Sequence, residues 1–293
     1  MVAKQCRPIL IRPNRFSPVT LRTVTEQTLL ARCCRQKHPR GGVVSERHVH
    51  PCGKLPRPTG RDTLLDTRTP SALANKLLAA LPSPDFETLK THFTIVPMAQ
   101  GTLLFEVDDE VDQVFFPLSG MVSLLVVLKS GNAIETATVG REGVVGAMAG
   151  LGLRKSRVRA VIQLPGTVAR MSVAQFKRAT LTSAAIANMC VTYDEVLLAQ
   201  ARMTAACNIS HAIEARFCRW LLQCRDRAES DAVPLTQEFL SEMLGVRRTS
   251  VTEVAIKLQE AGMIQYTRGI IHIMDLKKLS DHSCECYETL RSI

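Results

Sequence analysis

The residues best placed to do chemistry are four polar side chains that share one face of a predicted helix: Arg248, Thr249, Thr252 and Glu253. The opposite face carries apolar residues at the i, i+3, i+4, i+7 spacing of a buried stripe, namely Val251, Val254, Ala255 and Leu258. The outward guanidinium, hydroxyl and carboxylate groups can form the hydrogen bonds that reading the edges of DNA bases requires. The pattern predicts a surface that meets a groove of DNA.

The neighbouring segments would hold this helix in place. Thr236 can cap a preceding helix with one apolar face (Phe239, Leu240, Met243, Leu244), and Gly245 stands where that helix needs a left-handed terminating residue. After Gly262, apolar and polar residues alternate around an Arg268-Gly269 turn, which predicts a small hairpin. Two helices joined by a glycine occur in many helical domains. The short turn and the hairpin together favour a winged helix-turn-helix over Leu235–Met274.

The net charge of +10 does not support DNA binding by this segment. Residues 1–70 hold 14 Lys/Arg and 4 Asp/Glu, whereas the rest of the 293 residues holds 23 of each. Residues 1–71 are rich in Arg, Pro and Thr and lack periodicity, so we expect a basic tail with little fixed structure. It could be a non-specific DNA-binding arm, a solvated tail or the result of a misassigned start.

The ten cysteines lie at positions 6, 33, 34, 52, 190, 207, 218, 224, 284 and 286 and form no pair of C-x-x-C units. We therefore expect reduced thiols and no metal site. Four of them (190, 207, 218 and 224) lie in helical patterns, where cysteine usually behaves as a small apolar residue. Cys284 and Cys286 form the one close pair that suggests metal or redox chemistry, but we find no third ligand near them.

The middle of the chain has the pattern of a β domain. A helical pattern over Ser71–Thr91, broken at Pro82 and Pro84, precedes it. Turn residues then separate short strand candidates: Thr102–Glu106, Gln113–Pro117, Met121–Lys129, Ala133–Val139, Val158–Leu164 and Thr167–Met171. This spacing favours a sandwich or barrel. A helix should follow from Val173, with Ser172 and Gln175 as its capping box.

Both regions resemble the Crp/Fnr family of bacterial transcription regulators. In the carboxy-terminal region the likeness lies in Leu-Thr-Gln-Glu-Phe-Leu (235–240), Leu-Gly-Val-Arg-Arg-Thr-Ser-Val (244–251) and Leu-Gln-Glu-Ala-Gly-Met-Ile (258–264). In the β region it lies in Phe-Phe-Pro-Leu-Ser-Gly (115–120) and Val-Gly-Arg-Glu-Gly (139–143). The resemblance implies an α+β fold: a β-roll or jelly-roll sensor of the cyclic-nucleotide-binding type (72–181), a long dimerisation helix and hinge (182–230), and a winged helix-turn-helix (231–293). Some members carry an iron–sulfur cluster on amino-terminal cysteines, a spacing that this chain does not reproduce.

The resemblance also implies the DNA contacts. The recognition helix would start at Arg248, which could form a bidentate contact to guanine. The implied contact residues are Thr236, Gln237, Arg247, Arg248, Thr249, Ser250, Thr252, Glu253 and Arg268. Ser250 and Glu253 also fit a capping box, which would move the helix start to Val251. We expect the earlier start, because the box spacing is common by chance and the later start would lengthen the turn.

The expected effector pocket departs from the family. Members that bind cyclic nucleotides have a Gly-Glu pair for the ribose and a later Arg followed by Ser or Thr for the phosphate. Here Gly146 is followed by Ala147, while Arg154, Lys155 and Ser156 fall near the phosphate position. Without the carboxylate a ribose hydroxyl loses its acceptor, at about 1–3 kcal/mol. We expect no ordinary cyclic AMP binding and no cofactor. Arg154 and Lys155 could meet another anion or be a solvated loop pair.

A seven-residue repeat connects the two regions. Ile186, Tyr193, Gln200 and Cys207 recur every seven residues, as do Met189, Val196 and Met203, which is an a/d seam. A helix buried within one subunit would show the same repeat, but the family places its dimer interface here. A further helix with Ile213, Phe217, Trp220 and Leu221 on its core side should lead through a polar hinge, Arg225–Asp231.

The sequence therefore predicts a homodimeric regulator that binds an inverted repeat of double-stranded DNA, with RNA polymerase as a partner. The alternative is a ligand sensor whose helix-turn-helix contacts protein. No metalloprotease, phosphate-loop or nucleophile-elbow motif is present, so we expect no enzyme. No apolar run of about 18 residues and no apolar signal core occurs, so we expect no membrane partner and a cytoplasmic protein.

Overall fold

The computed structural model describes residues 71–292, so the expectations for the basic tail lie outside the described residues. The described part begins with three short helical segments, η1 (Ala72–Ala74), α1 (Lys76–Ala80) and α2 (Ser83–Lys90). The predicted helical pattern is confirmed with a break at Leu81 and Pro82, but the second predicted break, at Pro84, is wrong. Pro84 lies in the first turn of α2, where a missing amide hydrogen costs little. No described helix is long and apolar enough to cross a membrane.

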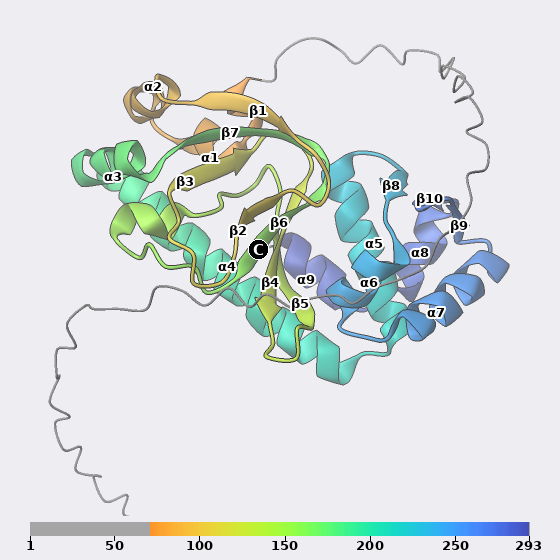
Figure 1. The fold of residues 1–293 in the computed structure, drawn as a ribbon. Coiled ribbons are helices and arrows are strands. Elements are labelled where there is room, and N and C mark those ends of the chain that lie inside the picture. Colours follow the sequence, from red (N-terminus) through yellow and green to blue (C-terminus); the bar gives the residue numbers. More distant parts are fainter. Residues whose placement is uncertain (1–70, 293) are drawn as a thin grey trace, which may run out of the picture. The chain divides into compact units, whose positions relative to one another are not determined.

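Two antiparallel sheets form the β-roll (Figure 1). One has the order β1 (Thr94–Met98), β7 (Gly166–Ser172), β3 (Gln113–Pro117). The other has the order β2 (Leu103–Phe105), β6 (Arg159–Leu164), β4 (Met121–Val127), β5 (Ala133–Val139). All six predicted strands are present, and β3 and β5 have the predicted bounds. The sequence did not predict β1, an edge strand that contains Pro97 and has no fully buried residue.

Three helices follow the β-roll. Ser172 caps α3 (Val173–Thr182) by accepting a hydrogen bond from the amide of Gln175, as predicted. The long helix α4 (Ala184–Ser210) follows it and is the predicted seam helix. The chain breaks at His211 and Ala212 and continues as α5 (Ile213–Ala228). The buried face of α5 includes the predicted Phe217, Trp220 and Leu221.

The carboxy-terminal region is a winged helix-turn-helix. Its elements are β8 (Ala232–Pro234), α6 (Gln237–Leu244), α7 (Arg248–Glu260), β9 (Ile264–Thr267), β10 (Ile270–Ile273), α8 (Leu276–His282) and α9 (Cys286–Ser292). Thr236 caps α6, and Gly245 ends it at φ 63°. The wing is the sheet β8-β10-β9, and its turn places Arg268 and Gly269 in the left-handed region. The predicted outline is confirmed.

One hydrophobic core joins the β-roll to the helix-turn-helix. Met121, Leu125 and Leu164, from β4 and β6, belong to the same buried cluster as Trp220 of α5 and Leu240 of α6. A second cluster fills the interior of the β-roll and includes Ile186 and Tyr193 of α4. The sheet β2-β6-β4-β5 therefore contributes side chains to two cores, and Figure 1 shows α5 and α6 beside β4 and β5.

Candidate DNA-contacting surface and effector pocket

Helix α7 begins at Arg248, as predicted, and not at Val251. Its N-cap is Arg247, which makes no capping hydrogen bond through its side chain. Ser250, which would cap the alternative start, lies within the first turn of the helix. The four apolar residues of the predicted stripe are all buried: Val251, Val254, Ala255 and Leu258. The polar face of α7 is consequently the one left open.

The predicted contact residues lie on this open side. Four are exposed at the start of α7 or further along it (Arg247, Arg248, Thr249, Glu253), and Ser250 and Thr252 are half-buried. From α6, Gln237 accepts a hydrogen bond from Arg248 Nε at 3.3 Å. Thr236 is exposed at the start of α6, and Arg268 is exposed at the turn of the wing. Together they form one polar surface of hydrogen-bonding groups on α6 and α7, with Arg268 on the adjoining wing.

A cavity of about 260 Å³ lies between the β-roll and α4. Gly146, Ala147, Lys155 and Ser156 line it, and so does Arg157, which the sequence analysis did not include. The remaining lining is mostly apolar: Phe105, Val111, Leu124, Val144, Val145, Met148, Ala149, Leu153, Val158, Cys190, Tyr193, Asp194 and Leu197. The cavity therefore combines an apolar wall with two cationic side chains.

Two residues of the expected phosphate site are already engaged. Arg154 Nη1 pairs with Glu110 Oε1 at 3.0 Å, and Arg154 is not among the lining residues. The Ser156 hydroxyl donates to the carbonyl oxygen of Val158 at 2.6 Å and accepts from the amide of Val158 at 3.2 Å. Of the two cations that line the cavity, Arg157 Nη1 lies 3.5 Å from Asp108 Oδ1, whereas Lys155 has no carboxylate within 4.0 Å among the described residues.

The first series of the predicted seam, Ile186, Tyr193 and Gln200, packs against the β-roll of the same chain. Ile186 and Tyr193 are buried in the β-roll core, and Gln200 is buried with its Oε1 accepting from the amide of Thr138 at 3.2 Å. These three residues are not exposed to a partner in this structure, so their assignment to a dimer interface is corrected to packing within the chain. Met189, Val196 and Met203, at the d positions, are half-buried.

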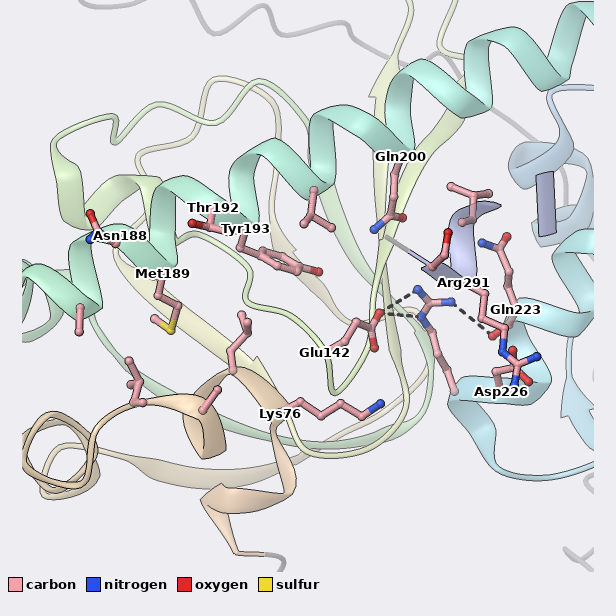
Figure 2. A pocket seen from close by; sticks show the side chains of 18 of the residues that line it. Lys76, Glu142, Asn188, Met189, Thr192, Tyr193, Gln200, Gln223, Asp226 and Arg291 are labelled. Atoms are coloured by element: carbon pink, nitrogen blue, oxygen red, sulfur yellow. Dashed lines mark hydrogen bonds and ion pairs between the residues drawn. The ribbon is translucent and has the colours of Figure 1, made fainter. Parts of the chain in front are cut away.

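A larger cavity of about 820 Å³ lies along the face of α4 that carries the predicted seam residues (Figure 2). Its walls come from α1, α4, α5 and α9, and the seam residues Met189, Tyr193, Val196 and Gln200 line it. Tyr193 also lines the smaller cavity, so its side chain separates the two. Its hydroxyl is buried and has no hydrogen-bond partner among the described residues.

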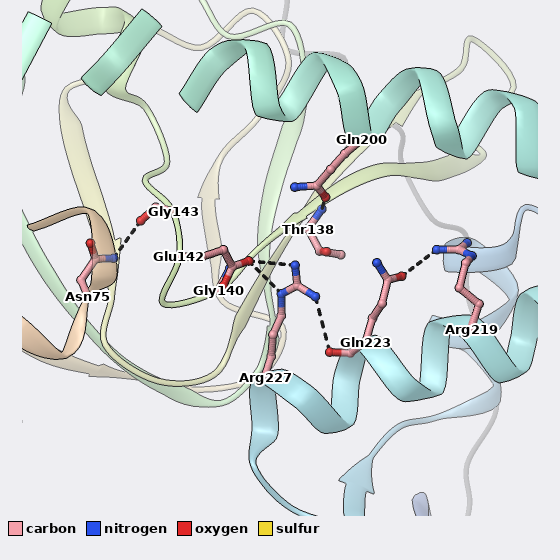
Figure 3. A network of polar contacts seen from close by, with 9 residues as sticks. All are labelled: Asn75, Thr138, Gly140, Glu142, Gly143, Gln200, Arg219, Gln223 and Arg227. Carbon is pink, nitrogen blue, oxygen red and sulfur yellow. Dashed lines mark hydrogen bonds and ion pairs between the residues drawn. The ribbon is translucent and has the colours of Figure 1, made fainter. Parts of the chain in front are cut away.

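Polar contacts connect the β-roll to α5 beside this cavity (Figure 3). Glu142 Oε1 accepts from Arg227 Nη2 at 2.8 Å and from the amide of Gly140 at 3.0 Å. Burial acts to raise the pKa of Glu142, but the charge of Arg227 and these hydrogen bonds hold that pKa below its ordinary value. The pair therefore remains ionised at neutral pH and joins the loop after β5 to the end of α5.

A second polar contact lies in the core between the domains. Glu135 of β5 is fully buried, accepts from Trp220 Nε1 at 2.7 Å and shares a 2.5 Å hydrogen bond with the Ser123 hydroxyl. Burial raises the pKa of Glu135 to about 7, although both hydrogen bonds oppose the shift. Sequence reasoning missed Glu135, Glu142 and Arg227. A glutamate at an inward position of an alternating strand was the available signal for Glu135.

The cysteine expectation needs a correction. The structure places Cys207 and His211, at the end of α4, beside Cys284, between α8 and α9, and Cys286, the first residue of α9. All four potential ligand atoms lie within 4.8 Å of one another, so the statement that the pair has no third ligand nearby is wrong. Its signal in the sequence was Cys207-x-x-x-His211, an i, i+4 pair on one helix face.

Together these elements define the class of this protein: a β-roll with an internal cavity, joined through a long helix to a winged helix-turn-helix. Residues 95–183 match the model of the cyclic nucleotide-binding domain. Residues 215–282 match the model of the Crp-like helix-turn-helix domain. The chain belongs to the Crp/Fnr family of transcription regulators.

Solved structures of this family have the same fold. A Crp/Fnr-family regulator of Eubacterium rectale is 16% identical, with a TM-score of 0.58 and coverage of 71% of this chain and 98% of that chain. FixK2 of Bradyrhizobium japonicum is 16% identical (TM-score 0.55; 66% and 98% covered). The c-di-GMP-responsive global regulator CLP of Xanthomonas campestris is also 16% identical (TM-score 0.56; 66% and 100% covered). No curated protein sequence matches the chain.

Proposed function

We propose that this regulator binds an inverted repeat of double-stranded DNA as a homodimer and reads it with the first turns of α7. The observation that carries the proposal is the division of α7 into a fully buried apolar face and an open polar face that begins at Arg248. Residues 235–274 hold four basic and four acidic side chains, so specificity has to come from placed groups and not from bulk charge. Arg248, positioned by Gln237, is the group best suited to a bidentate contact with guanine.

Selection of bound sites from random DNA, followed by gel shifts at several salt concentrations, tests this proposal. Arg248→Ala should weaken binding by about 1–3 kcal/mol and relax the preference at one base pair of each half-site. Lys257→Ala is the matched control, because it removes the same charge from the same helix about 13 Å further along its axis.

Equal weakening on every sequence would assign Arg248 to a phosphate contact. Failure to retain any DNA, even at low salt, would instead favour the alternative that the helix-turn-helix contacts protein.

The homodimer would form along the exposed face of α4. Val191 and Leu198 are exposed one heptad apart, at 57% and 43%, and Ala205 continues the series. Ala187 and Ala201 lie between them, so small residues would let two copies of α4 approach closely, with Asp194 at the edge of this face. A two-fold dimer of this kind would present its recognition helices about 34 Å apart, one turn of DNA.

Analytical ultracentrifugation at micromolar concentration tests the dimer. Leu198→Glu should shift the protein to monomer, since it places a charge at the centre of the helix pair. Leu181→Glu, a 75% exposed position on α3, should leave the dimer intact. Monomer alone in the unsubstituted protein, or dimer in both variants, would refute this interface.

The effector pocket would be the cavity of about 260 Å³ between the β-roll and α4. We expect its ligand to be largely apolar with an anionic group, because the apolar lining meets only Lys155 and Arg157 as cations. Cyclic AMP is a poor fit, since Ala147 offers no acceptor for a ribose hydroxyl. Asp194 belongs both to this lining and to the proposed dimer face, so a bound effector would change how the two subunits pack against each other. The altered dimer would then contact RNA polymerase differently at the promoter.

Calorimetric titrations test the pocket. Cyclic AMP and cyclic di-GMP should show no binding, while a medium-chain fatty acid should bind and lose affinity in Lys155→Met. Lys129→Met on the β4–β5 turn serves as the charge control. Tight binding of cyclic AMP would overturn this assignment without affecting the DNA contacts.

A further inference from the structure

Three cysteines and one histidine converge where α4 meets the carboxy-terminal helices. Cys207 and His211 come from the last turn of α4 and its cap. Cys284 comes from the link between α8 and α9, and Cys286 is the first residue of α9. The three cysteines are buried and His211 is half-buried. Cys207 Sγ lies 3.6 Å from Cys284 Sγ, and Cys286 Sγ lies 3.6 Å from His211 Nδ1. We propose that these four residues form a tetrahedral zinc site.

The distances fit one metal ion. With Zn–S bonds of about 2.3 Å and a Zn–N bond of about 2.0–2.1 Å, a tetrahedron has S–S edges of about 3.8 Å and S–N edges of about 3.6 Å. All four ligand atoms lie within 4.8 Å of one another, so small rotations of the side chains close the site. An iron–sulfur cluster would place several atoms between the thiolates and needs a wider cage. A disulfide needs an S–S distance of about 2.05 Å.

Buried positive charge around the cluster fits such a site. Zinc with three thiolates and a neutral histidine carries a net charge of −1. Arg216 and Arg219 are only 7% and 5% exposed, and within residues 71–292 neither pairs with a carboxylate within 4.0 Å. The Nε of each has no hydrogen-bond partner among the described residues. The charge of Arg219 acts on all three cysteines, and that of Arg216 interacts with Cys207 and Cys284. Each guanidinium donates only to neutral acceptors, Arg216 to Asn208 Oδ1 and Leu244 O and Arg219 to Gln223 Oε1, so an anionic metal centre would compensate two buried charges that have no carboxylate partner.

The outer contact of His211 also suits metal binding. Its Nδ1 faces the cluster, while its Nε2 lies 3.8 Å from Glu285 Oε1. At 3.8 Å the two atoms form no hydrogen bond, but a small rotation of the exposed Glu285 side chain would let Nε2 donate to the carboxylate and leave Nδ1 free to bind the ion. Binding would replace the three thiol protons, which pass to solvent, and involves no change of oxidation state.

The four proposed ligands lie in segments that flank the matched helix-turn-helix domain and not within that domain. Cys207 and His211 precede the matched helix-turn-helix region 215–282, and Cys284 and Cys286 follow it. A bound ion would connect the end of α4 to the end of the helix-turn-helix region across the break at His211–Ala212. This role does not depend on the proposed DNA sequence or effector.

Elemental analysis of the purified, reduced full chain tests the site. We expect about one zinc per chain, and loss of that zinc in the Cys284→Ser/Cys286→Ser double variant. Cys190→Ser should keep it, because Cys190 lies in the β-roll core, away from the cluster, and its Sγ donates to Ile186 O in the same helix. Serine at Cys6, Cys33, Cys34 and Cys52 should also leave the zinc content unchanged. Zinc that persists in the double variant, or disappears when only those four are replaced, overturns the proposal.

A milder substitution separates metal loss from misfolding. Glu285 is 87% exposed, so Glu285→Gln should fold, yet it should weaken zinc binding about 10- to 100-fold in competition with a chromophoric chelator. Glu288→Gln, also exposed, is its matched control. Co²⁺ added to metal-free protein should give the absorption of a tetrahedral thiolate complex that saturates at one equivalent. The proposal is wrong if a Cys207–Cys284 disulfide persists after purification under reducing conditions, or if no cobalt complex forms.

Discussion

The buried carboxyl of Glu135 should make the stability of this protein fall as pH rises from about 4.5 to about 7. In the folded chain its pKa is raised from 4.5 to about 7, chiefly by burial. Between these values the unfolded chain releases the proton while the folded chain keeps it, so rising pH favours unfolding. The stabilising contribution is complete below pH 4.5 and is lost by about pH 7. At about 1.36 kcal/mol per pKa unit, the loss amounts to about 3 kcal/mol.

Glu135→Gln should remove this dependence. Glutamine keeps an acceptor for Trp220 Nε1 and a polar partner for Ser123, but it does not ionise. Urea unfolding can be followed by the fluorescence of Trp220, the single tryptophan of the chain, which lies against the substituted residue.

The free energy of unfolding of the unsubstituted protein, relative to the variant, should drop by about 2–3 kcal/mol between pH 5 and pH 8. Glu87→Gln, an exposed position on α2, is the control, and its free energy of unfolding should change with pH as that of the unsubstituted protein does. A difference between the unsubstituted protein and Glu135→Gln that stays constant with pH would refute the reasoning.

Three other substitutions test the contacts of α1, α4 and α5 with the β-roll. Asn75→Ala leaves the carbonyl oxygens of Pro117 and Gly143 without their donor and removes the side-chain cap of α1, and thermal unfolding should show a loss of about 1–3 kcal/mol. An unchanged melting curve would mean that water replaces the amide. Tyr193→Phe removes a buried hydroxyl without a partner, so stability measured by urea should stay the same or rise by about 1 kcal/mol; a loss would reveal a hidden contact. Arg227→Met breaks the pair with Glu142, and because the Glu142 side chain is 37% exposed we expect only about 1–2 kcal/mol. Adding Glu142→Gln should recover part of that loss, and no recovery would argue against direct coupling.

The elements with strong local signals could be predicted from the sequence. Helix α7 was placed correctly because the resemblance to the family and the length of the turn after Gly245 both favour a start at Arg248. Strands β3 and β5 were bounded by turn residues on both sides. Strand β1 was missed because Pro97 interrupts it and little of it is buried.

The direction in which a periodic face points could not be predicted. The repeat of Ile186, Tyr193 and Gln200 indicates that one side of α4 is buried, and either a partner helix or the chain's own β-roll could bury it. In the structure the β-roll does so. The cysteine cluster was hidden for a related reason. Cys207 and Cys284 are 77 residues apart, and only the packing of α9 against the end of α4 brings them together.

The position of Tyr193 has a thermodynamic consequence. Its ring forms part of the wall of both cavities, and the backbone of Gly143 packs so closely that even a methyl group there would collide with the phenol. A molecule that displaces this ring from one side therefore changes the volume available on the other. Because such linkage is reciprocal, any contact that reshapes the space between α4 and α9 must alter effector affinity by the same factor by which the effector alters that contact.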